Sequence, residues 1–226
     1  MHVPSEASAV AVAVESGAAV RSALEELLTE SERRSYRALA AERRADWLSA
    51  RVALKEALRR SRRRDDISIE YDPSGAPQLS GCDDLRCSIA HSDGAGFAAV
   101  AHESIGADLE RVRPRPWRLI RHVCVPAELR YLDGLASSGD ELLTLAWTVK
   151  EAVLKGLRVG LRIAPLKVRL SDRVPAGVCV EVRSASVRCR RWVVAAEIDR
   201  GFALAIALPE GHIGQVGYAW YQPHRV

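Results

Sequence analysis

The chain has 226 residues, of which 48% are hydrophobic and 27% charged, and its formal net charge is +4. A chain of this size and composition can bury one core or two modest ones, as an ordinary soluble globular protein does. The apolar stretch 7–14 is too short to cross a bilayer, and no Lys or Arg precedes it as a signal peptide requires. We therefore expect no membrane association, and a first strand at this stretch.

The cysteines indicate the cellular compartment. They are five in number, and they show neither a Cys-x-x-Cys motif nor a nearby His at zinc spacing: Cys82, Cys87, Cys124, Cys179 and Cys189. This pattern suggests reduced thiols and a cytoplasmic protein.

The basic residues give little support to nucleic-acid binding. The Arg-rich run 59–64 is followed by Asp65 and Asp66, and most runs of this kind are solvated loops or helix ends. No aromatic residues interleave with these cations, and no zinc or helix-turn-helix pattern accompanies them. We expect no nucleic-acid partner.

The hydrophobic pattern predicts two main helices and a series of short strands. One helix includes residues 47–55, and the other follows the capping-box pattern Ser138 to Glu141 and keeps helical spacing of apolar residues as far as Gly156. The expected strands are short, alternating or fully apolar, and bounded by turn residues: 67–71, 86–91, 96–102, 105–109, 166–170, 178–182, 192–198 and 202–208.

The two helices resemble each other. Residues 47–55 align without gaps with residues 147–155 and share Trp, Leu and Lys at the same spacing. Chance similarity between two amphipathic helices is the alternative, because such helices use few residue types. Since strands follow each helix, we expect an α+β pseudo-dimer in which each half packs a long helix on a small, mainly antiparallel sheet. The expected halves are 1–103 and 104–226, with a ligand site in the cleft between them.

Acidic residues and one lysine gather in the second half. A strand projects Asp108 and Glu110 from the same face, and a helix places Glu151 one turn before Lys155. Three carboxylates and an ammonium suit Mg²⁺ that holds a phosphorylated ligand. Taken singly, Asp-x-Glu is usually a solvated strand edge and Glu151 with Lys155 is a common surface ion pair.

The choice of lysine also carries information. Only four of the 33 cationic side chains are Lys, and three of them lie in the repeated helices: Lys55, Lys150 and Lys155. An ammonium can donate a proton where a guanidinium effectively cannot, so Lys155 is the candidate acid. Lys150 is interpreted either as a second such residue or as a solvated one. Lys55 is expected to fix the packing of the halves or to contact a phosphate.

Three segments resemble a known family. Residues 106–110 (Gly-Ala-Asp-Leu-Glu), 147–156 (Trp-x-x-Lys-Glu-Ala-x-x-Lys-Gly) and 88–92 (Ser-Ile-Ala-His-Ser) are similar to the signatures of the surfactin-type 4'-phosphopantetheinyl transferases. The resemblance extends over about residues 29–170, and the two carboxylate segments carry most of its specificity.

The chain also departs from the family pattern. Gly75, Ala76 and Pro77 stand where the family carries a Gly-Lys-Pro or Gly-Arg-Pro turn, so the cation of that turn is missing. Ala90 lacks the hydroxyl of the usual Ser-His-Ser. Neither departure removes a metal ligand, and both remove contacts to coenzyme A. Glu128 stands where the family carries an acidic residue at a helix start.

The resemblance implies an enzyme that transfers 4'-phosphopantetheine from coenzyme A to a serine of an apo acyl or peptidyl carrier protein, with release of 3',5'-ADP. It implies Mg²⁺, with Mn²⁺ as the alternative ion, on Asp108, Glu110 and Glu151. Glu151 or Glu128 would accept the proton of the serine, and Lys155 would stabilise or protonate the departing 3',5'-ADP.

The resemblance also implies the residues that bind the co-substrate. Coenzyme A is expected at Arg34, Arg44, Gly75, Ala76, Pro77, Ala90, His91, Asp108 and Lys155. The alternative for His91 is a plain histidine at a strand end. The implied partner is an acidic carrier protein of polyketide or nonribosomal peptide biosynthesis, and we expect a monomer.

Two alternatives come from other functional classes. A metal-dependent phosphodiesterase can use an Asp-x-Glu pair, but Val112 stands where such enzymes usually place a Lys after the second acidic residue. The other alternative is a catalytically inactive module that binds coenzyme A or a carrier protein. Intact Asp108, Glu110, Glu151 and Lys155 argue against it, because a binding module has no use for all four.

Overall fold

The computed structural model describes residues 9–15, 21–62, 67–73, 75–187, 191–212 and 216–221. The first half contains β1 (Ala9–Glu15), α1 (Arg21–Glu26), α2 (Glu30–Ala38), α3 (Ala41–Arg62), β2 (Ser68–Tyr71), β3 (Pro77–Ser80), β4 (Arg86–Ser92) and β5 (Ala95–Ala101).

The second half is longer and has more short turns. It contains β6 (Gly106–Arg111), η1 (Trp117–Leu119), α4 (Ile120–Val123), η2 (Pro126–Leu132), α5 (Gly139–Gly156), η3 (Gly160–Arg162), η4 (Pro165–Lys167), β7 (Val168–Val174), β8 (Gly177–Val182), β9 (Arg191–Asp199), β10 (Phe202–Pro209) and β11 (Val216–Tyr221), where η marks a 3₁₀ turn.

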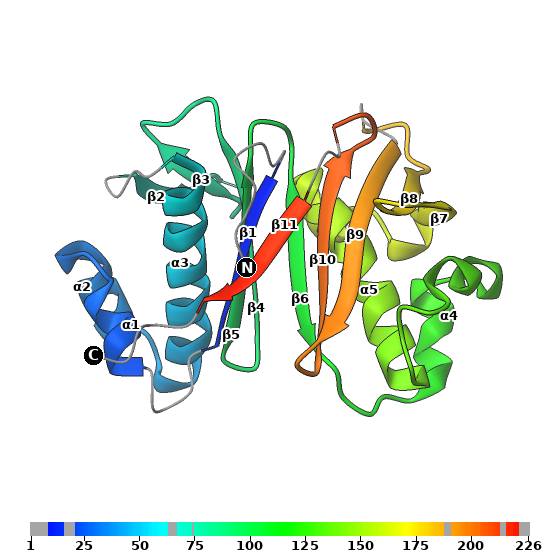
Figure 1. Ribbon diagram of the computed structural model, residues 1–226, viewed down its shortest axis with the longest axis horizontal. Coiled ribbons are helices and arrows are strands. Elements are labelled where there is room, and N and C mark those ends of the chain that lie inside the picture. The colour runs from blue at the N-terminus through cyan, green and yellow to red at the C-terminus, as the bar shows by residue number, and fades with distance from the viewer. Residues whose placement is uncertain are drawn as a thin grey trace.

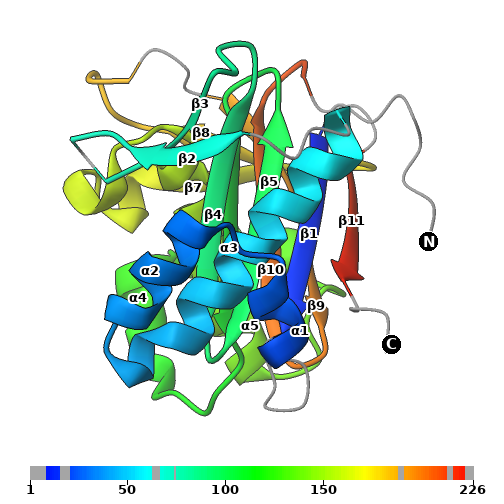
Figure 2. The same cartoon turned by 90° about the vertical axis from the view of Figure 1, so that its left-hand side faces the viewer.

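Four layers are stacked in the order helix, sheet, sheet, helix (Figure 1). One sheet has the strand order β11-β1-β5-β4 and the other β6-β10-β9-β8-β7. Helix α3 covers the outer face of the first sheet, as the turned view shows most clearly (Figure 2), and α5 covers the outer face of the second. The predicted α+β architecture of two helix-on-sheet halves is confirmed.

The two sheets meet through complementary side chains. The alanines of β1 face the second sheet and its valines face α3. In β10 the arrangement is reversed, because its Phe, Leu and Ile side chains face the first sheet and its alanines face α5. Small side chains on one sheet therefore meet large side chains on the other, which gives the close packing that a buried sheet interface needs.

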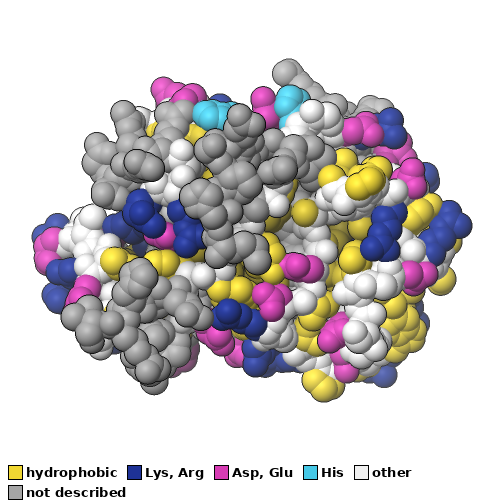
Figure 3. All heavy atoms as spheres, viewed as in Figure 1, with side chains coloured by type: hydrophobic (Ala, Val, Ile, Leu, Met, Phe, Trp, Pro, Cys, Tyr) yellow, Lys and Arg dark blue, Asp and Glu magenta, His cyan; other side chains and the backbone are white. Residues whose placement is uncertain are grey.

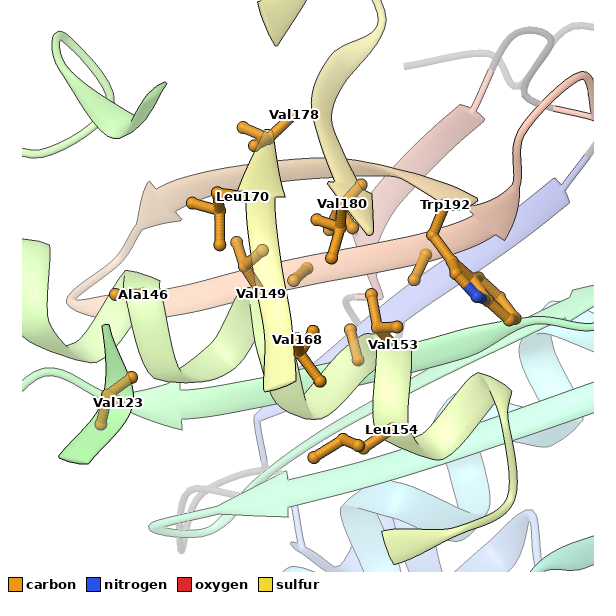
Figure 4. Packing of buried hydrophobic residues seen from close by; sticks show 14 of the residues in the cluster. Val123, Ala146, Val149, Val153, Leu154, Val168, Leu170, Val178, Val180 and Trp192 are labelled. Atoms are coloured by element: carbon orange, nitrogen blue, oxygen red, sulfur yellow. The ribbon is translucent and has the colours of Figure 1, made fainter. Parts of the chain in front are cut away.

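The core of the second half lies between α5 and the strands β7 to β10 (Figure 4). Val149 and Val153 of α5 point toward the valines and leucine of β7 and β8, and the buried ring of Trp192 closes one end of the cluster. Gly156, at the end of α5, leaves room for this ring, since a Cβ atom there would lie 2.7 Å from it. Helix α5 is thus fixed along its length and at its end.

Two glycines allow the long helices to approach their sheets closely. A Cβ atom on Gly96 of β5 would lie 2.1 Å from the backbone nitrogen of Ala50 in α3, and one on Gly106 of β6 would lie 1.7 Å from the carbonyl oxygen of Ala152 in α5. Both contacts are with backbone atoms, which cannot move aside without displacing the helix. Both halves therefore rely on the missing side chain of a glycine in a strand.

The capping box predicted at the start of α5 is present with one change. Ser138 accepts a hydrogen bond from the backbone of Glu141 at 3.2 Å. The Glu141 carboxylate in turn accepts a hydrogen bond from the N–H of Ser137 at 2.6 Å. In a standard capping box the donor would be the N–H of Ser138, one residue later.

Several strand predictions need correction. The strand predicted at 166–170 begins only at Val168, because Pro165 opens the 3₁₀ turn η4. Strands β3 and β11 were not predicted, since β3 buries only Leu79 and has no apolar alternation.

Among the described residues, no helix is long and apolar enough to span a membrane.

The last strand returns to the first sheet. β11 runs parallel to β1, with Ala9 opposite Val216 and Val14 opposite Tyr221. β11 therefore adds an edge strand to the sheet of the first half. The division at residues 103 and 104 stays a prediction. Residues 7 and 8 of the predicted first strand, residues 63 and 64 of the basic run, the two Asp residues after it and Cys189 lie outside the described residues. The other four cysteines are buried free thiols.

The close approach of α5 to β6 leads to a stability prediction. Gly106→Ala should destabilise the protein by at least about 2 kcal/mol, because the new methyl group overlaps the backbone of α5. Gly139→Ala is the matched control, since its Cβ atom would lie 3.8 Å from the Trp117 ring, at ordinary contact distance. The control should retain or slightly raise the free energy of unfolding in urea titrations. Equal effects of the two substitutions would contradict the packing described.

Candidate active site

The three predicted acidic residues come together where α5 packs on β6. Asp108 is buried on β6, and Glu110 and Glu151 are partly buried. Burial and, after it, the charge of Asp108 raise the pKa of both glutamates, and the charge of Glu110 adds to the effect on Glu151. The sequence prediction that a strand and a helix jointly present these carboxylates agrees with this arrangement.

Lys155 joins the helix to the strand. Its ammonium lies 2.6 Å from Oδ1 of Asp108 and donates a longer bond of 3.4 Å to the carbonyl oxygen of Ile89 on β4. The Lys155 side chain is 31% exposed whereas Asp108 is almost fully enclosed. The cation therefore stands between a buried carboxylate and solvent, with contacts to both halves.

Glu110 is held by several groups from different elements. Trp147 Nε1 donates to its Oε1 at 3.2 Å, and Ser92 Oγ donates to its Oε2 at 3.4 Å. Arg115 lies 3.9 Å from the same Oε2. Burial, followed by the charge of Asp108, raises the pKa of Glu110. The orientation of this carboxylate is thus set by both halves.

Glu151 is the least neutralised of the three. Burial, followed by the charge of Asp108, raises its pKa to about 7, although Lys155 acts in the opposite direction. Among the described residues, Glu151 Oε1 and Asp108 Oδ2 are buried oxygens without a hydrogen-bond partner. Buried unpaired acceptors beside one another are costly unless a proton or a cation joins them.

The donor set is chemically suited to a hard divalent cation. It consists only of carboxylate oxygens, two of which are unpaired. In the described part of the chain, no three His, Cys, Asp or Glu side chains are close enough to hold an ion as they stand. Asp108 turns one oxygen to Lys155, and Glu110 turns its oxygens to Trp147 and Ser92.

Two serines of β4 fasten the first half to β6. Ser88 Oγ accepts a hydrogen bond from the N–H of Ala107 at 2.9 Å, and Ser92 Oγ accepts one from the N–H of Arg111 at 3.1 Å. β4 and β6 belong to different sheets, so these side chains replace a backbone ladder. The sequence analysis assigned neither serine this role, although their spacing of four places both on one face of a strand.

His91 lines a cavity of about 410 Å³ against α3, together with Trp47, Arg51 and Tyr71. Its Nδ1 lies 3.2 Å from the carboxylate of Asp46. The guanidinium of Arg51 stacks over the Trp47 ring at 4.8 Å, and among the described residues its buried NH1 has no hydrogen-bond partner. This cavity thus combines aromatic surfaces with a cation that has a free donor.

A second cavity, of about 330 Å³, lies between the halves. The turn residues Gly75, Ala76 and Pro77 form one wall, and Lys155 with the segment that follows α5 forms another. Ile89 lines both cavities, so they adjoin each other across β4. Ala90 is buried between the two sheets and lines neither cavity.

A third cavity, of about 390 Å³, lies between the turn that joins β7 to β8 and the strands β9, β10 and β11, and it includes Glu197. Hydrophobic side chains gather over the second half on the face shown in Figure 3. None of the predicted site residues lines this cavity, so it is separate from the carboxylate cluster.

The two first-half arginines predicted to bind coenzyme A lie at separate positions on α2 and α3. Arg34 is exposed on α2. Arg44 donates to the carbonyl oxygens of Leu39 and Arg37, at 3.0 and 2.9 Å, and thereby caps the end of α2. Neither arginine lines the cavity that contains His91.

Glu128 forms a buried ion pair with Lys150. Lys150 is fully buried and also donates to the carbonyl oxygen of Val123 at 2.7 Å. The Glu128 oxygens accept further bonds from the N–H groups of Leu170 and Val125, both at 2.8 Å. Lys150 is therefore not solvated, and both oxygens of Glu128 already accept hydrogen bonds. The pair attaches η2 and β7 to α5.

Lys55 differs from its aligned partner in its surroundings. It lies 2.7 Å from Glu32, whose carboxylate also completes a capping box with Thr29. The contact ties α3 to α2 within the first half. At the position of Glu151, α3 carries Arg51, so the first half presents no carboxylate there.

Comparison with known proteins connects this site to a family. Residues 104–207 match the family model of the 4'-phosphopantetheinyl transferase superfamily. A similar solved structure is that of Thermotoga maritima holo-[acyl-carrier-protein] synthase, at 22% sequence identity and a TM-score of 0.39, over 47% of this chain and 62% of that chain. No curated protein matches the chain. The matched residues include Asp108, Glu110, Glu151 and Lys155 and exclude β4 and α3.

The raised pKa of Glu151 predicts how stability changes with pH. The unfolded chain releases this proton near 4.5 and the folded protein near 7, so this group stabilises the fold below pH 4.5 and its contribution is lost as pH rises to 7. Glu151→Gln should leave thermal stability similar at pH 4 and raise it at pH 8 without divalent cations. Mg²⁺ should then stabilise the natural protein more than the variant. Identical pH dependence of the two melting temperatures would contradict the assignment.

Proposed function

We propose that this protein is a surfactin-type 4'-phosphopantetheinyl transferase that modifies a serine of an apo acyl or peptidyl carrier protein, using coenzyme A. The observation that carries the proposal is the convergence of Asp108, Glu110, Glu151 and Lys155 beside the cleft between the halves. The superfamily match over residues 104–207 supports it independently.

Lys155 would act on the leaving group. Its ammonium is partly exposed, lines the cleft and is held by the buried carboxylate of Asp108. A cation in this position can neutralise the charge that develops as the bond to 3',5'-ADP breaks, or can donate a proton to it. Asp108 would keep the ammonium aimed into the cleft.

Glu151 would act as the base. Without a bound cation, burial and the charge of Asp108 raise the pKa of this carboxyl to about 7, and an oxygen that a cation leaves free can accept a proton from a serine hydroxyl at neutral pH. Of the two glutamates considered from sequence, only Glu151 keeps an unpaired oxygen, since the bonds to Glu128 come from Lys150 and from two backbone groups. We therefore assign the base to Glu151 alone.

Asp108, Glu110 and Glu151 would hold Mg²⁺, or Mn²⁺ in its place. When bound, the ion supplies charge neutralisation at the pyrophosphate of coenzyme A. Ser92 and Trp147 would fix the direction from which Glu110 approaches, because both donate to its carboxylate.

Coenzyme A would lie across the two adjoining cavities. Its nucleotide end would use the first-half cavity, where His91, Trp47 and Arg51 offer a polar ring, an aromatic surface and a free guanidinium donor. Its pyrophosphate would lie near Lys155. The first half, residues 1–103, would thus bind the nucleotide, and the second half, 104–226, would carry the reacting groups.

The carrier protein would approach along the segment after β6. Residues 111–121 contain five arginines, and exposed Trp117 and Leu119 lie among them. Arg115 of this segment already reaches Glu110. A basic surface with an apolar centre fits an acidic partner that carries the reacting serine to Glu151.

The alternatives are less consistent with these contacts. A binding module gains nothing from two buried unpaired carboxylate oxygens, which cost stability. The phosphodiesterase alternative is disfavoured by Val112, which stands where such enzymes usually place a Lys.

Mass spectrometry of carrier proteins tests the proposal. The protein is incubated with coenzyme A, Mg²⁺ and a panel of acidic apo carriers, and the carriers are then weighed. We expect one carrier to gain the mass of one phosphopantetheine group in a Mg²⁺-dependent manner. Coenzyme A hydrolysis without any carrier modification would favour the phosphodiesterase, and binding without either reaction would favour the inactive module.

The two aligned lysines give a matched pair of variants. Lys155→Ala should lower the transfer rate about 10²- to 10⁴-fold, because it removes the group beside the leaving oxygen. Lys55→Ala should retain the maximal rate and lose up to about 1 kcal/mol of stability, since it breaks only the bond to Glu32. Equal loss of the single-turnover rate in two folded variants would require a site shared by both helices.

The basic segment predicts that carrier binding depends on salt. Apparent affinity should fall as ionic strength rises, because screening acts over about 10 Å at 0.1 M. Arg118→Glu should raise the KM for the carrier severalfold, whereas Arg183→Glu, a charge reversal at an exposed residue directly after β8, should not. A KM that is flat from low to high salt would indicate an apolar docking surface, such as one around exposed Leu161.

A further inference from the structure

The cleft cavity between the halves is an anion-binding environment. Of the described residues that line it, three are cationic, Lys155, Arg158 and Arg162, and none is a carboxylate. Small residues form the opposite wall, since Gly75 and Ala76 carry no long side chain into it. A cavity of about 330 Å³ with this lining suits a phosphate group better than an apolar ligand.

Arg158 adopts a backbone conformation that favours glycine. Its φ is +55°, in the left-handed region, directly after the end of α5. This is the place where helices usually end with a glycine, because a side chain there is strained. An arginine at such a position indicates that its side chain has a use that outweighs the strain.

The guanidinium of Arg158 reaches from the second half to the first. Its NH1 lies 3.5 Å from the carboxylate of Asp72, and its NH2 lies 3.4 Å from the carbonyl oxygen of Pro77. Both distances are long for charge-assisted hydrogen bonds. A guanidinium has five N–H donors, so these two contacts orient it and leave donors for a ligand.

Arg162 is fixed beside it by backbone carbonyl groups. Its Nε donates to the oxygen of Val159 at 3.0 Å, and its NH2 donates to the oxygen of Arg158 itself at 3.1 Å. The second guanidinium is therefore held at the rim of the same cavity before any ligand arrives. Two pre-oriented guanidinium groups beside an ammonium form a site for a charged phosphate oxygen.

We propose that Arg158, supported by Arg162, binds a phosphate group of coenzyme A from the second half of the protein. Its guanidinium reaches the turn in which Ala76 offers no charge, so the cation at this wall of the cleft comes from the segment after α5. The proposal rests on coenzyme A being the co-substrate, and it is tested by binding alone.

The decisive variant is Arg158→Gly. Glycine removes the guanidinium and relieves the left-handed strain, so the melting temperature should be unchanged or higher. Calorimetric titration with coenzyme A and with 3',5'-ADP should show binding about ten- to hundredfold weaker than that of the natural protein. Arg158→Lys should restore part of the affinity, because it keeps the charge and loses the paired donors.

Arg200→Gly is the matched control. Arg200 also has a positive φ, of 51°, but it lies in the turn between β9 and β10 and is not among the residues that line the cleft. This variant should bind both ligands as the natural protein does.

Dephospho-coenzyme A, which lacks the 3'-phosphate, shows which phosphate Arg158 contacts. If Arg158 binds the 3'-phosphate, Arg158→Gly should bind coenzyme A and dephospho-coenzyme A with the same affinity. If Arg158 binds the pyrophosphate, Arg158→Gly should weaken the binding of both compounds equally.

The purely structural alternative gives the opposite pattern. If Arg158 serves only to link the halves, Arg158→Gly lowers the melting temperature and leaves both affinities unchanged, which overturns the proposal. If the protein modifies no carrier but its binding of 3',5'-ADP still depends on Arg158, the phosphate site stands and the transferase function does not.

Discussion

The candidate site depends on how closely α5 approaches β6. The missing side chain of Gly106 lets the strand lie against the backbone of Ala152, and the ion pair between Lys155 and Asp108 forms at 2.6 Å across this contact. A longer separation would leave Asp108 as a buried charge without a cation, which proteins rarely tolerate. The packing of one helix on one strand thus determines the electrostatics of the candidate site.

The two halves share a scaffold and differ in charge. Both contain a long helix that lies against a strand glycine, at Gly96 and at Gly106. The first half places Arg51 and Lys55 on its helix, where the second half places Glu151 and Lys155. One half therefore offers cations to a ligand and the other offers carboxylates to a cation. A phosphorylated substrate between them would contact both kinds of group, which gives a physical reason for a single site in a pseudo-symmetric fold.

Sequence periodicity was sufficient for the parts of the site that lie on regular elements. Alternation along a strand paired Asp108 with Glu110, and the helical repeat stacked Glu151 with Lys155. The same reasoning left Lys150 undecided between solvent and reaction centre, because its partner Glu128 comes from a 3₁₀ segment whose position no pattern specifies. Arg158 was not found either, since its role depends on a backbone angle and on a turn 81 residues earlier in the chain.

Contacts between the halves were also beyond the sequence pattern. Ser88 and Ser92 bind the edge of one sheet to the edge of the other, and β11 adds to a sheet that begins at the opposite end of the chain. Such pairings join segments far apart in sequence, and local propensity carries no information about them.

Mn²⁺ binding shows whether Asp108, Glu110 and Glu151 form one cation site. Free Mn²⁺ can be counted by electron paramagnetic resonance during titration of the protein with 3',5'-ADP present. We expect one Mn²⁺ to bind per chain and to be displaced by Mg²⁺, and we expect Asp108→Asn or Glu151→Gln to weaken its affinity at least about tenfold. Glu128→Gln, matched in chemistry but placed in the buried pair with Lys150, should leave the affinity of any folded fraction unchanged. Absence of a stoichiometric site, or a site indifferent to the first two substitutions, would contradict the account.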